Sequence, residues 1–160
     1  MDELRFACDA MLGKLARWLR LAGFDASFEP EAASAAAVGR ARAEGRWLLT
    51  RNRALAASAG PRSLLLRSAA TGGQVAELRD RLPLAADPAR FLTRCSRCNT
   101  TLQEVARETV LERVPPFVAA HAARLVACEG CGRVYWPGTH VGRIAHTLGR
   151  WFVAPPEGDR

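Results

Sequence analysis

Short apolar runs alternate with amphipathic stretches along the first 82 residues of the chain. Residues 4–8 form an apolar run that stops at Asp9, and apolar positions recur at helical spacing within residues 14–22. The first pattern predicts a strand and the second an amphipathic helix. The same alternation predicts further strands at residues 25–28, 47–50 and 63–66, and further helices at 31–44, 53–59 and 74–82.

Strands that alternate with helices predict an α/β fold. Such strands pair in parallel through right-handed crossovers, which gives a three-layer arrangement with helices on both faces of the sheet. The run at 47–50 is apolar, so we expect this strand to be buried on both faces. Gly23 follows the helix at 14–22, where a left-handed helix cap costs least with glycine.

The pattern changes near residue 90. From residue 93 onward the chain carries cysteine pairs, a charged stretch and aromatic residues in place of alternating strands and helices. We therefore expect an α/β domain at residues 1–90, a small zinc ribbon at 91–150 and a C-terminal tail at 151–160.

Four of the five cysteines form two CxxC pairs, Cys95 with Cys98 and Cys128 with Cys131. Each tight turn directs two thiolates to one point, and two such turns supply the four ligands of a tetrahedral structural zinc ion. An iron site uses the same ligands, and a disulfide or redox pair is the other alternative, although a redox motif needs one CxxC rather than two. Cys8 lies inside the first apolar run, so we expect a buried thiol.

The chain is strongly basic, which favours a phosphate-rich partner. Its 160 residues carry a formal net charge of +7 with a pI ≈ 10.1, and Lys14 is the only lysine among 23 basic residues. The planar guanidinium of arginine pairs with two phosphate oxygens at once. The alternative is an ordinary basic surface from an arginine-rich proteome.

The apolar pattern predicts neither a membrane protein nor a secreted one. The chain has no run of about 18 uncharged apolar residues, and its N-terminus lacks the basic flank and apolar stretch of a signal peptide. Cysteines paired for a metal site also suit a reducing compartment. We therefore expect a cytoplasmic protein with no membrane partner.

Asp9 and Asn52 follow the predicted strands at 4–8 and 47–50. Ligands of a parallel α/β sheet bind beyond the carboxyl ends of its strands, which makes these two residues site candidates. A carboxylate there can ligate Mg²⁺ or Mn²⁺, and such ions promote phosphodiester hydrolysis. The alternative for Asp9 is an N-cap of the following helix.

Several motifs resemble, in the same order, the prokaryotic family named after the C-terminal ribonuclease domain of the Mut-seven exonuclease. The resemblance covers roughly residues 4–148. The matching segments are 6–25 (FACDAMLGKLARWLRLAGFD), 45–53 (GRWLLTRNR), 94–99 (RCSRCN), 128–131 (CEGC) and 134–140 (VYWPGTH).

This resemblance implies a PIN-like nuclease domain followed by a zinc ribbon, acting on RNA with a divalent metal held by carboxylates. Asp9 matches the first metal-binding aspartate of the family. Asn52 stands where the family usually has aspartate, and Ser34 and Ala35 stand where it usually carries acids. Glu31, like Glu29, lies near those two positions but out of register.

We therefore expect Asp9, Asn52 and Glu31 to form the catalytic site, with Mg²⁺ or Mn²⁺ as cofactor. Tyr135 and Trp136 beside arginines are typical of RNA base stacking, and the alternative is that they pack the ribbon against the first domain. The residues expected to bind RNA are Lys14, Arg17, Arg51, Arg53, Arg133, Tyr135, Trp136, His140 and Arg143.

Three functions fit this sequence. The first is a metal-dependent, PIN-like ribonuclease with a weakened acidic site. The second is a non-catalytic RNA-binding protein that keeps the zinc ribbon and the basic surface, which the residues at positions 34, 35 and 52 favour. The third is a zinc-stabilised module for protein interaction, whose partners the sequence does not name.

Overall fold

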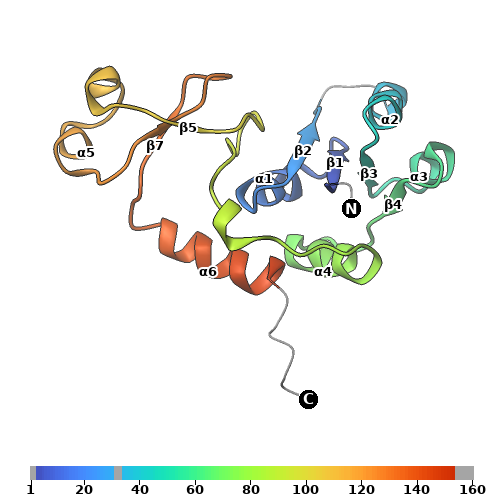
Figure 1. Cartoon of the computed structure of the whole chain (residues 1–160). Helices are drawn as coiled ribbons and strands as arrows, with labels where there is room; N and C mark the ends of the chain where they lie inside the picture. Colours follow the sequence, from blue (N-terminus) through green and yellow to red (C-terminus); the bar gives the residue numbers. More distant parts are fainter. Residues whose placement is uncertain (1–2, 31–33, 154–160) are drawn as a thin grey trace, which may run out of the picture.

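The computed structural model describes residues 3–30 and 34–153, and its N-terminal part is a parallel sheet between two layers of helices (Figure 1). The four strands pair in the order β2-β1-β3-β4, and every pair is parallel. The elements of this part are β1 (Arg5–Cys8), α1 (Gly13–Leu21), β2 (Asp25–Phe28), α2 (Ser34–Ala43), β3 (Trp47–Thr50), α3 (Arg53–Ala59), β4 (Ser63–Leu65) and α4 (Thr71–Arg81).

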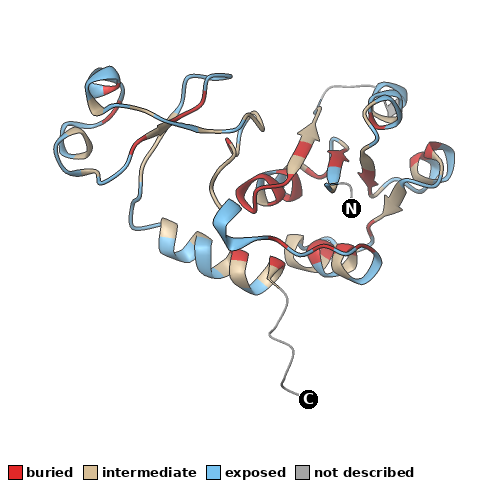
Figure 2. Ribbon diagram, viewed as in Figure 1, coloured by how far each residue is buried: buried red, intermediate tan, exposed pale blue. Residues whose placement is uncertain are grey.

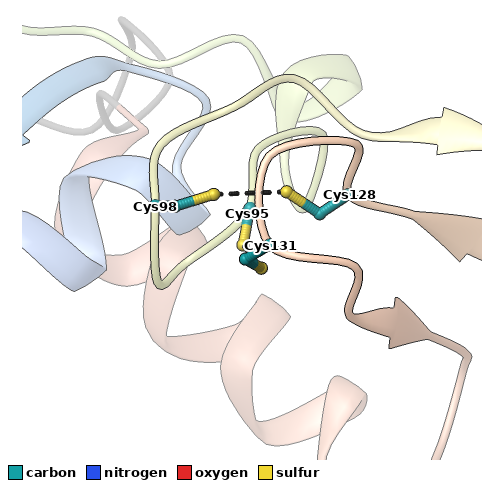
Figure 3. Close-up of side chains that lie close together, drawn as sticks. All are labelled: Cys95, Cys98, Cys128 and Cys131. Carbon is teal, nitrogen blue, oxygen red and sulfur yellow. Dashed lines mark hydrogen bonds between the residues drawn. The ribbon is translucent and has the colours of Figure 1, made fainter.

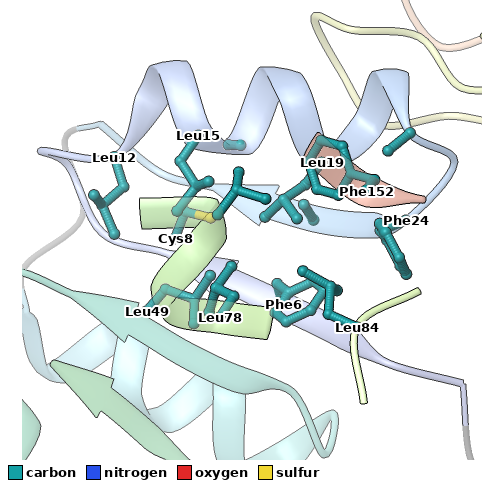
Figure 4. Packing of buried hydrophobic residues seen from close by; sticks show 14 of the residues in the cluster. Phe6, Cys8, Leu12, Leu15, Leu19, Phe24, Leu49, Leu78, Leu84 and Phe152 are labelled. Atoms are coloured by element: carbon teal, nitrogen blue, oxygen red, sulfur yellow. The ribbon is translucent and has the colours of Figure 1, made fainter. Parts of the chain in front are cut away.

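Successive side chains of the central strands point to opposite faces, and each face has its own core. On one face Phe6 and Cys8 of β1 pack with Leu15 and Leu19 of α1, and helices α4 and α6 (Val141–Phe152) complete this layer (Figure 4). On the other face Ala7 and its neighbours in β3 pack against α2 and α3. The expected three-layer α/β fold is therefore confirmed.

Helix α1 ends at a left-handed glycine, as its sequence predicts. Gly23 has φ +93°, and its N–H and that of Phe24 donate to the carbonyls of Arg20 and Leu19, which satisfies two free carbonyls of the last turn. A Cβ at Gly23 would also lie 2.6 Å from the carbonyl oxygen of Arg90. Position 23 therefore needs glycine for its φ angle and for the space.

The predicted start of the fourth helix, at residue 74, was wrong, because α4 begins at Thr71. Gly72 and Gly73 lower helix propensity, which hides this first turn in the sequence. Both glycines are in close contact with other parts of the fold: a Cβ at Gly72 would lie 3.1 Å from the Trp151 ring, and one at Gly73 would overlap Ser68.

The C-terminal part is a small ribbon that stands to one side of the sheet (Figure 1). Its antiparallel strands β5 (Gln103–Glu104), β6 (Val126–Ala127) and β7 (Val134–Tyr135) pair in that order. Between β5 and β6 lie two 3₁₀ turns, η2 (Arg107–Thr109) and η3 (Leu111–Arg113), and helix α5 (Pro116–His121); a further turn, η1 (Pro88–Arg90), precedes the ribbon. Most ribbon residues are exposed or half-buried (Figure 2), so burial alone provides little stability here.

The last helix, α6 (Val141–Phe152), returns from the ribbon to the α/β core. Leu148 and Phe152 are fully buried there, and the Trp151 ring lies 5.0 Å from that of Trp18 in α1. The helix thus extends past residue 150, the predicted end of the ribbon, into the predicted tail at 151–160, while the domain boundaries themselves stay a prediction. None of the described helices has the length and apolar character needed to cross a membrane.

Candidate functional site

The Asp9 carboxylate lies at the carboxyl edge of the sheet, held by a fully buried threonine. β1 and β3 are neighbours in register, so Asp9 follows Cys8 directly opposite the end of β3. The Thr50 hydroxyl donates to Asp9 Oδ2 and accepts the backbone N–H of Asn52 at 2.9 Å. The other carboxylate oxygen, Oδ1, accepts the N–H of Met11 at 3.0 Å. Both oxygens are therefore oriented, and each keeps lone pairs for a further partner.

Asp9 does not cap the following helix. The N-cap position of α1 belongs to Leu12, whose N–H donates to the Asp9 carbonyl in a turn. The N-cap alternative for Asp9 was therefore wrong, because the chain makes one extra turn before α1 begins at Gly13.

Asn52 is the N-cap of α3. Its Oδ1 accepts the N–H of Leu55 at 3.1 Å, and the side chain is exposed. Aspartate caps helices about as well as asparagine, so a carboxylate at this position would keep the cap. Asn52 therefore lies beside Thr50 and Asp9 as the sequence suggests, but one of its oxygen lone pairs serves the helix.

The other acids near this edge have partners elsewhere or lie outside the described residues. Glu29 forms an ion pair with Arg40, and Glu31 belongs to the residues that the structure does not describe. Within residues 3–30 and 34–153, the four paired cysteines are the only group of three or more His, Cys, Asp or Glu side chains close enough to share a metal ion. Ser34 and Ala35 are the first residues of α2.

The four paired cysteines lie in two CxxC turns, called here the first knuckle (residues 95–98) and the second knuckle (residues 128–131). Their sulfurs converge at one point between the two knuckles (Figure 3). Their sulfurs lie within 4.8 Å of one another, with Cys95 and Cys131 at 3.7 Å and Cys98 and Cys128 at 3.2 Å. Tetrahedral ligands at about 2.3 Å from zinc stand about 3.8 Å apart, so this set fits such an ion. All five cysteines are free thiols, and Cys8 is buried in the core as expected.

The two knuckles have the same backbone design. Asn99 and Gly132, which directly follow the second cysteine of each pair, have φ angles of +73° and +74°. Their N–H groups donate to the carbonyls of Cys95 and Cys128 at 2.9 and 2.8 Å. Asparagine tolerates the left-handed region better than most residues, which explains its presence without glycine in the first knuckle.

The surroundings of the sulfurs favour thiolates at two of the four positions. Burial raises the pKa of Cys95, but hydrogen bonds from the Tyr135 hydroxyl, at 3.1 Å, and from backbone N–H groups outweigh it and lower the pKa. Burial opposes ionisation of Cys98 too, yet hydrogen bonds from Thr100 lower its pKa to about 6. Thiolates are the form that binds a metal.

A polar network fastens the first knuckle to the edge strand β2. Asn99 donates to Asp25 Oδ1 at 2.6 Å and accepts the N–H of Ala26 at 3.0 Å. Arg46 holds the same carboxylate with two donors, at 2.6 and 3.2 Å. Burial opposes the charge on Asp25, but these hydrogen bonds prevail and hold its pKa below the ordinary value. Asp25 is thus a strand-start residue with a docking role and not a neighbour of Asp9.

The predicted RNA-binding residues fall into two groups. Lys14 and Arg17 are exposed on α1, which follows Asp9 in the chain, while Arg51 and Arg53 flank Asn52 after β3. Within the part of the chain that the structure describes, none of them has a carboxylate within 4 Å; the same holds for Arg133 and Arg143, which lie on the ribbon side with His140.

The two aromatic residues after the second knuckle face the ribbon itself. Trp136 is half-buried against the small cluster of Val110, Val114 and Leu125. The Tyr135 hydroxyl points to Cys95. A role for either in RNA stacking stays a prediction.

Sequence reasoning missed Thr50, although it stands in a quoted motif. The signal that could have found it is a polar residue at the last position of an apolar strand. A polar side chain that is fully buried there, as Thr50 is, needs hydrogen-bond partners. Arg20, discussed below, was missed because an arginine in an amphipathic helix normally predicts an exposed position.

These features define an α/β protein with an oriented carboxylate at the carboxyl edge of its sheet and an attached four-cysteine metal ribbon. The model of the Mut7-C RNAse domain family matches residues 4–148, nearly the whole chain, and the chain belongs to this family. Searches of curated proteins and of solved structures found no match. Membership of the family supports a ribonuclease, with RNA as its substrate.

Proposed function

We propose that this chain is a PIN-like, metal-dependent ribonuclease that cleaves RNA at the Asp9 edge of the sheet. The observation that carries the proposal is the Asp9 carboxylate, oriented by the buried Thr50 hydroxyl, with Lys14 in the first turn of α1 and Arg51 and Arg53 directly after β3. Unneutralised cations beside an oriented carboxylate suit a phosphodiester substrate, because they attract the phosphates that the carboxylate alone would repel.

A divalent ion would bind at this edge together with RNA, because the RNA phosphates would supply further oxygen ligands beside Asp9. Mg²⁺ commonly uses one or two carboxylates together with substrate phosphates, and Asp9 supplies one carboxylate. When bound, Mg²⁺ or Mn²⁺ activates a water and offsets charge on the phosphate. Asp9 would hold the ion, the backbone of Asn52 is linked to Asp9 through the Thr50 hydroxyl, and the arginines would position the RNA backbone.

The ribbon would bind zinc and position RNA. Four thiolates close a tetrahedral site, and Arg133, His140 and Arg143 follow it on an exposed segment. Reduced thiols in a metal site also suit the cytoplasm.

Cleavage of a labelled single-stranded RNA with Mn²⁺ or Mg²⁺ tests the nuclease proposal. We expect Asp9→Asn to abolish cleavage and Asn52→Asp to raise it, because the second carboxylate strengthens metal binding without loss of the α3 cap. Asp87→Asn is the matched control, since Asp87 makes a similar turn hydrogen bond, to the N–H of Ala89, far along the chain. Unchanged rates in both Asp9→Asn and Asn52→Asp would move the cleavage site away from this edge.

A non-catalytic RNA-binding protein is the second candidate. It is favoured by Asn52, Ser34 and Ala35, and by the fact that no group of three or more His, Cys, Asp or Glu side chains close enough to share a metal ion includes Asp9 among the described residues. In that case RNA binds equally well with and without added Mg²⁺ or Mn²⁺, neither the natural chain nor Asn52→Asp cleaves, and affinity measured by fluorescence anisotropy falls steeply with salt. Undetectable binding at low salt excludes both candidates.

A further inference from the structure

Arg20 is a buried cation without a carboxylate partner. Among the described residues it is the only buried charged side chain, at 6% exposed, and no described carboxylate lies within 4 Å of it. Its Nε donates to the carbonyl of Ala26 at 2.8 Å, and its Nη1 donates to the carbonyls of Ser96 and Arg97 at 3.2 and 2.8 Å. Carbonyl dipoles alone compensate a buried guanidinium poorly, so a buried charge normally has an anionic partner.

Two groups of the α/β domain could supply that anion, but neither of them is a partner of Arg20. The Asp25 carboxylate is held by Arg46 and Asn99. The Cys8 thiol stays neutral, because burial raises its pKa to about 12.

The remaining candidate for the anionic partner of Arg20 is the four-cysteine cluster of the ribbon. Ser96 and Arg97 are the two residues between the first pair of ligands, so Arg20 lies directly against the knuckle. Four thiolates around one divalent ion leave two negative charges in excess.

We propose that Arg20 is the counter-ion of the metal–thiolate centre and positions its first knuckle from the α/β domain. The side chain of Arg20 would stabilise the centre in two ways: its charge offsets the excess of the thiolates, and its two bonds to the knuckle carbonyls hold the turn between Cys95 and Cys98. The α/β domain thereby contributes directly to metal affinity. The inference rests on the zinc centre of the proposed function, since it concerns the metal-loaded ribbon.

Zinc affinity, measured by competition with a chromophoric chelator on the full chain, tests the role of Arg20. We expect Arg20→Gln to raise the zinc dissociation constant about tenfold or more, because residues that support metal ligands typically contribute factors of about 10–100. Arg20→Lys keeps the charge and should stay within about threefold of the natural chain. Arg42→Gln is the matched control, since Arg42 also donates to carbonyls, of Ser58 and Ala59, but far from the knuckles.

If Arg20 has a purely structural role, its replacement changes the stability of the chain but not its zinc affinity. The midpoint of unfolding would then fall equally in zinc-loaded and zinc-free Arg20→Gln, with an unchanged zinc dissociation constant, and this result overturns the proposal. If Arg20→Gln does not fold, Arg20→Lys decides: weakening well beyond threefold shows that a positive charge at this position does not support the centre, and overturns the counter-ion role. A natural chain that binds no zinc refutes the zinc ribbon itself, which is a separate failure.

Discussion

Thr50 shows how one buried hydroxyl orients a carboxylate at the edge of the sheet. It is fully buried at the end of β3, accepts the N–H of Asn52 and donates to Asp9, so it joins the two candidate site residues. An oriented carboxylate loses less freedom when it binds a metal or a phosphate.

We predict that Thr50→Val lowers the cleavage rate about tenfold, because the Asp9 carboxylate loses its fixed donor. RNA affinity should not change, and the free energy of unfolding should fall by about 1 kcal/mol for the lost hydrogen bonds. Thr50→Ser keeps the hydroxyl and serves as the control. If the natural rate is too low to measure, the comparison is made in the Asn52→Asp background. Equal rates for the valine and serine variants would contradict an orienting role.

Asp25 predicts a pH dependence of stability. Its pKa is lowered in the folded chain despite burial, because Arg46 and Asn99 hydrogen-bond the carboxylate. The stabilisation is therefore complete above the ordinary aspartate pKa of about 4 and is lost as the pH falls through the lower folded value.

We expect Asp25→Asn to lower the free energy of unfolding by about 2 kcal/mol at pH 7, as is usual for hydrogen bonds to a charged group. The difference from the natural chain should shrink below about pH 4, where Asp25 also becomes neutral. Chemical denaturation at several pH values measures it, with exposed Asp87→Asn as control. A difference that stays constant down to low pH would show that the charge does not matter.

At the scale of elements, the end of α1 links helix, strand and ribbon. Gly23 permits the turn into β2, and Arg20, one residue before the end of the helix at Leu21, reaches the first knuckle. The close approach of the Arg90 carbonyl to Gly23 places the connecting segment against the same turn.

We predict that Gly23→Ala destabilises the chain by about 3 kcal/mol, because the new Cβ meets both a positive φ angle and the Arg90 carbonyl. Gly39→Ala is the opposite control: Gly39 is an exposed position within α2 with no atom near its would-be Cβ, so alanine should stabilise by up to about 1 kcal/mol. Thermal melts of both variants measure the contrast. Equal effects would mean that helix propensity and not the turn decides at Gly23.

At the scale of the whole molecule, two attachments join the ribbon to the α/β domain. The first is the polar network of the first knuckle with Asp25 and Arg20, and the second is α6, whose Leu148 and Phe152 are buried in the main core. The ribbon is therefore held at both its beginning and its end. Its own core around Val110 and Leu125 is small, so we expect a metal ion at the four cysteines to contribute much of its stability.

We expect the purified chain to contain about one zinc per molecule and to lose the ribbon structure when a strong chelator removes it. The melting temperature should fall, and Cys128→Ser should reproduce the effect, whereas Cys8→Ser should keep full zinc content. Metal analysis and thermal melts provide the measurement. Full zinc content in Cys128→Ser would exclude the four-cysteine site.

The sequence by itself determined the alternation of strands and helices, the capped end of α1, the two matched cysteine pairs and Asp9 at a strand end. All of these follow from local rules: apolar spacing, a glycine after a helix, and two CxxC turns. Only the tertiary structure decided what depends on residues far apart in the chain. Thr50 meets Asp9 because β1 and β3 are neighbours, Arg20 is buried because the first knuckle covers it, and α6 packs closely on α4 because Gly72 leaves room for Trp151. A local pattern cannot show such contacts, because burial and hydrogen-bond partners at these positions come from segments that only the fold brings together.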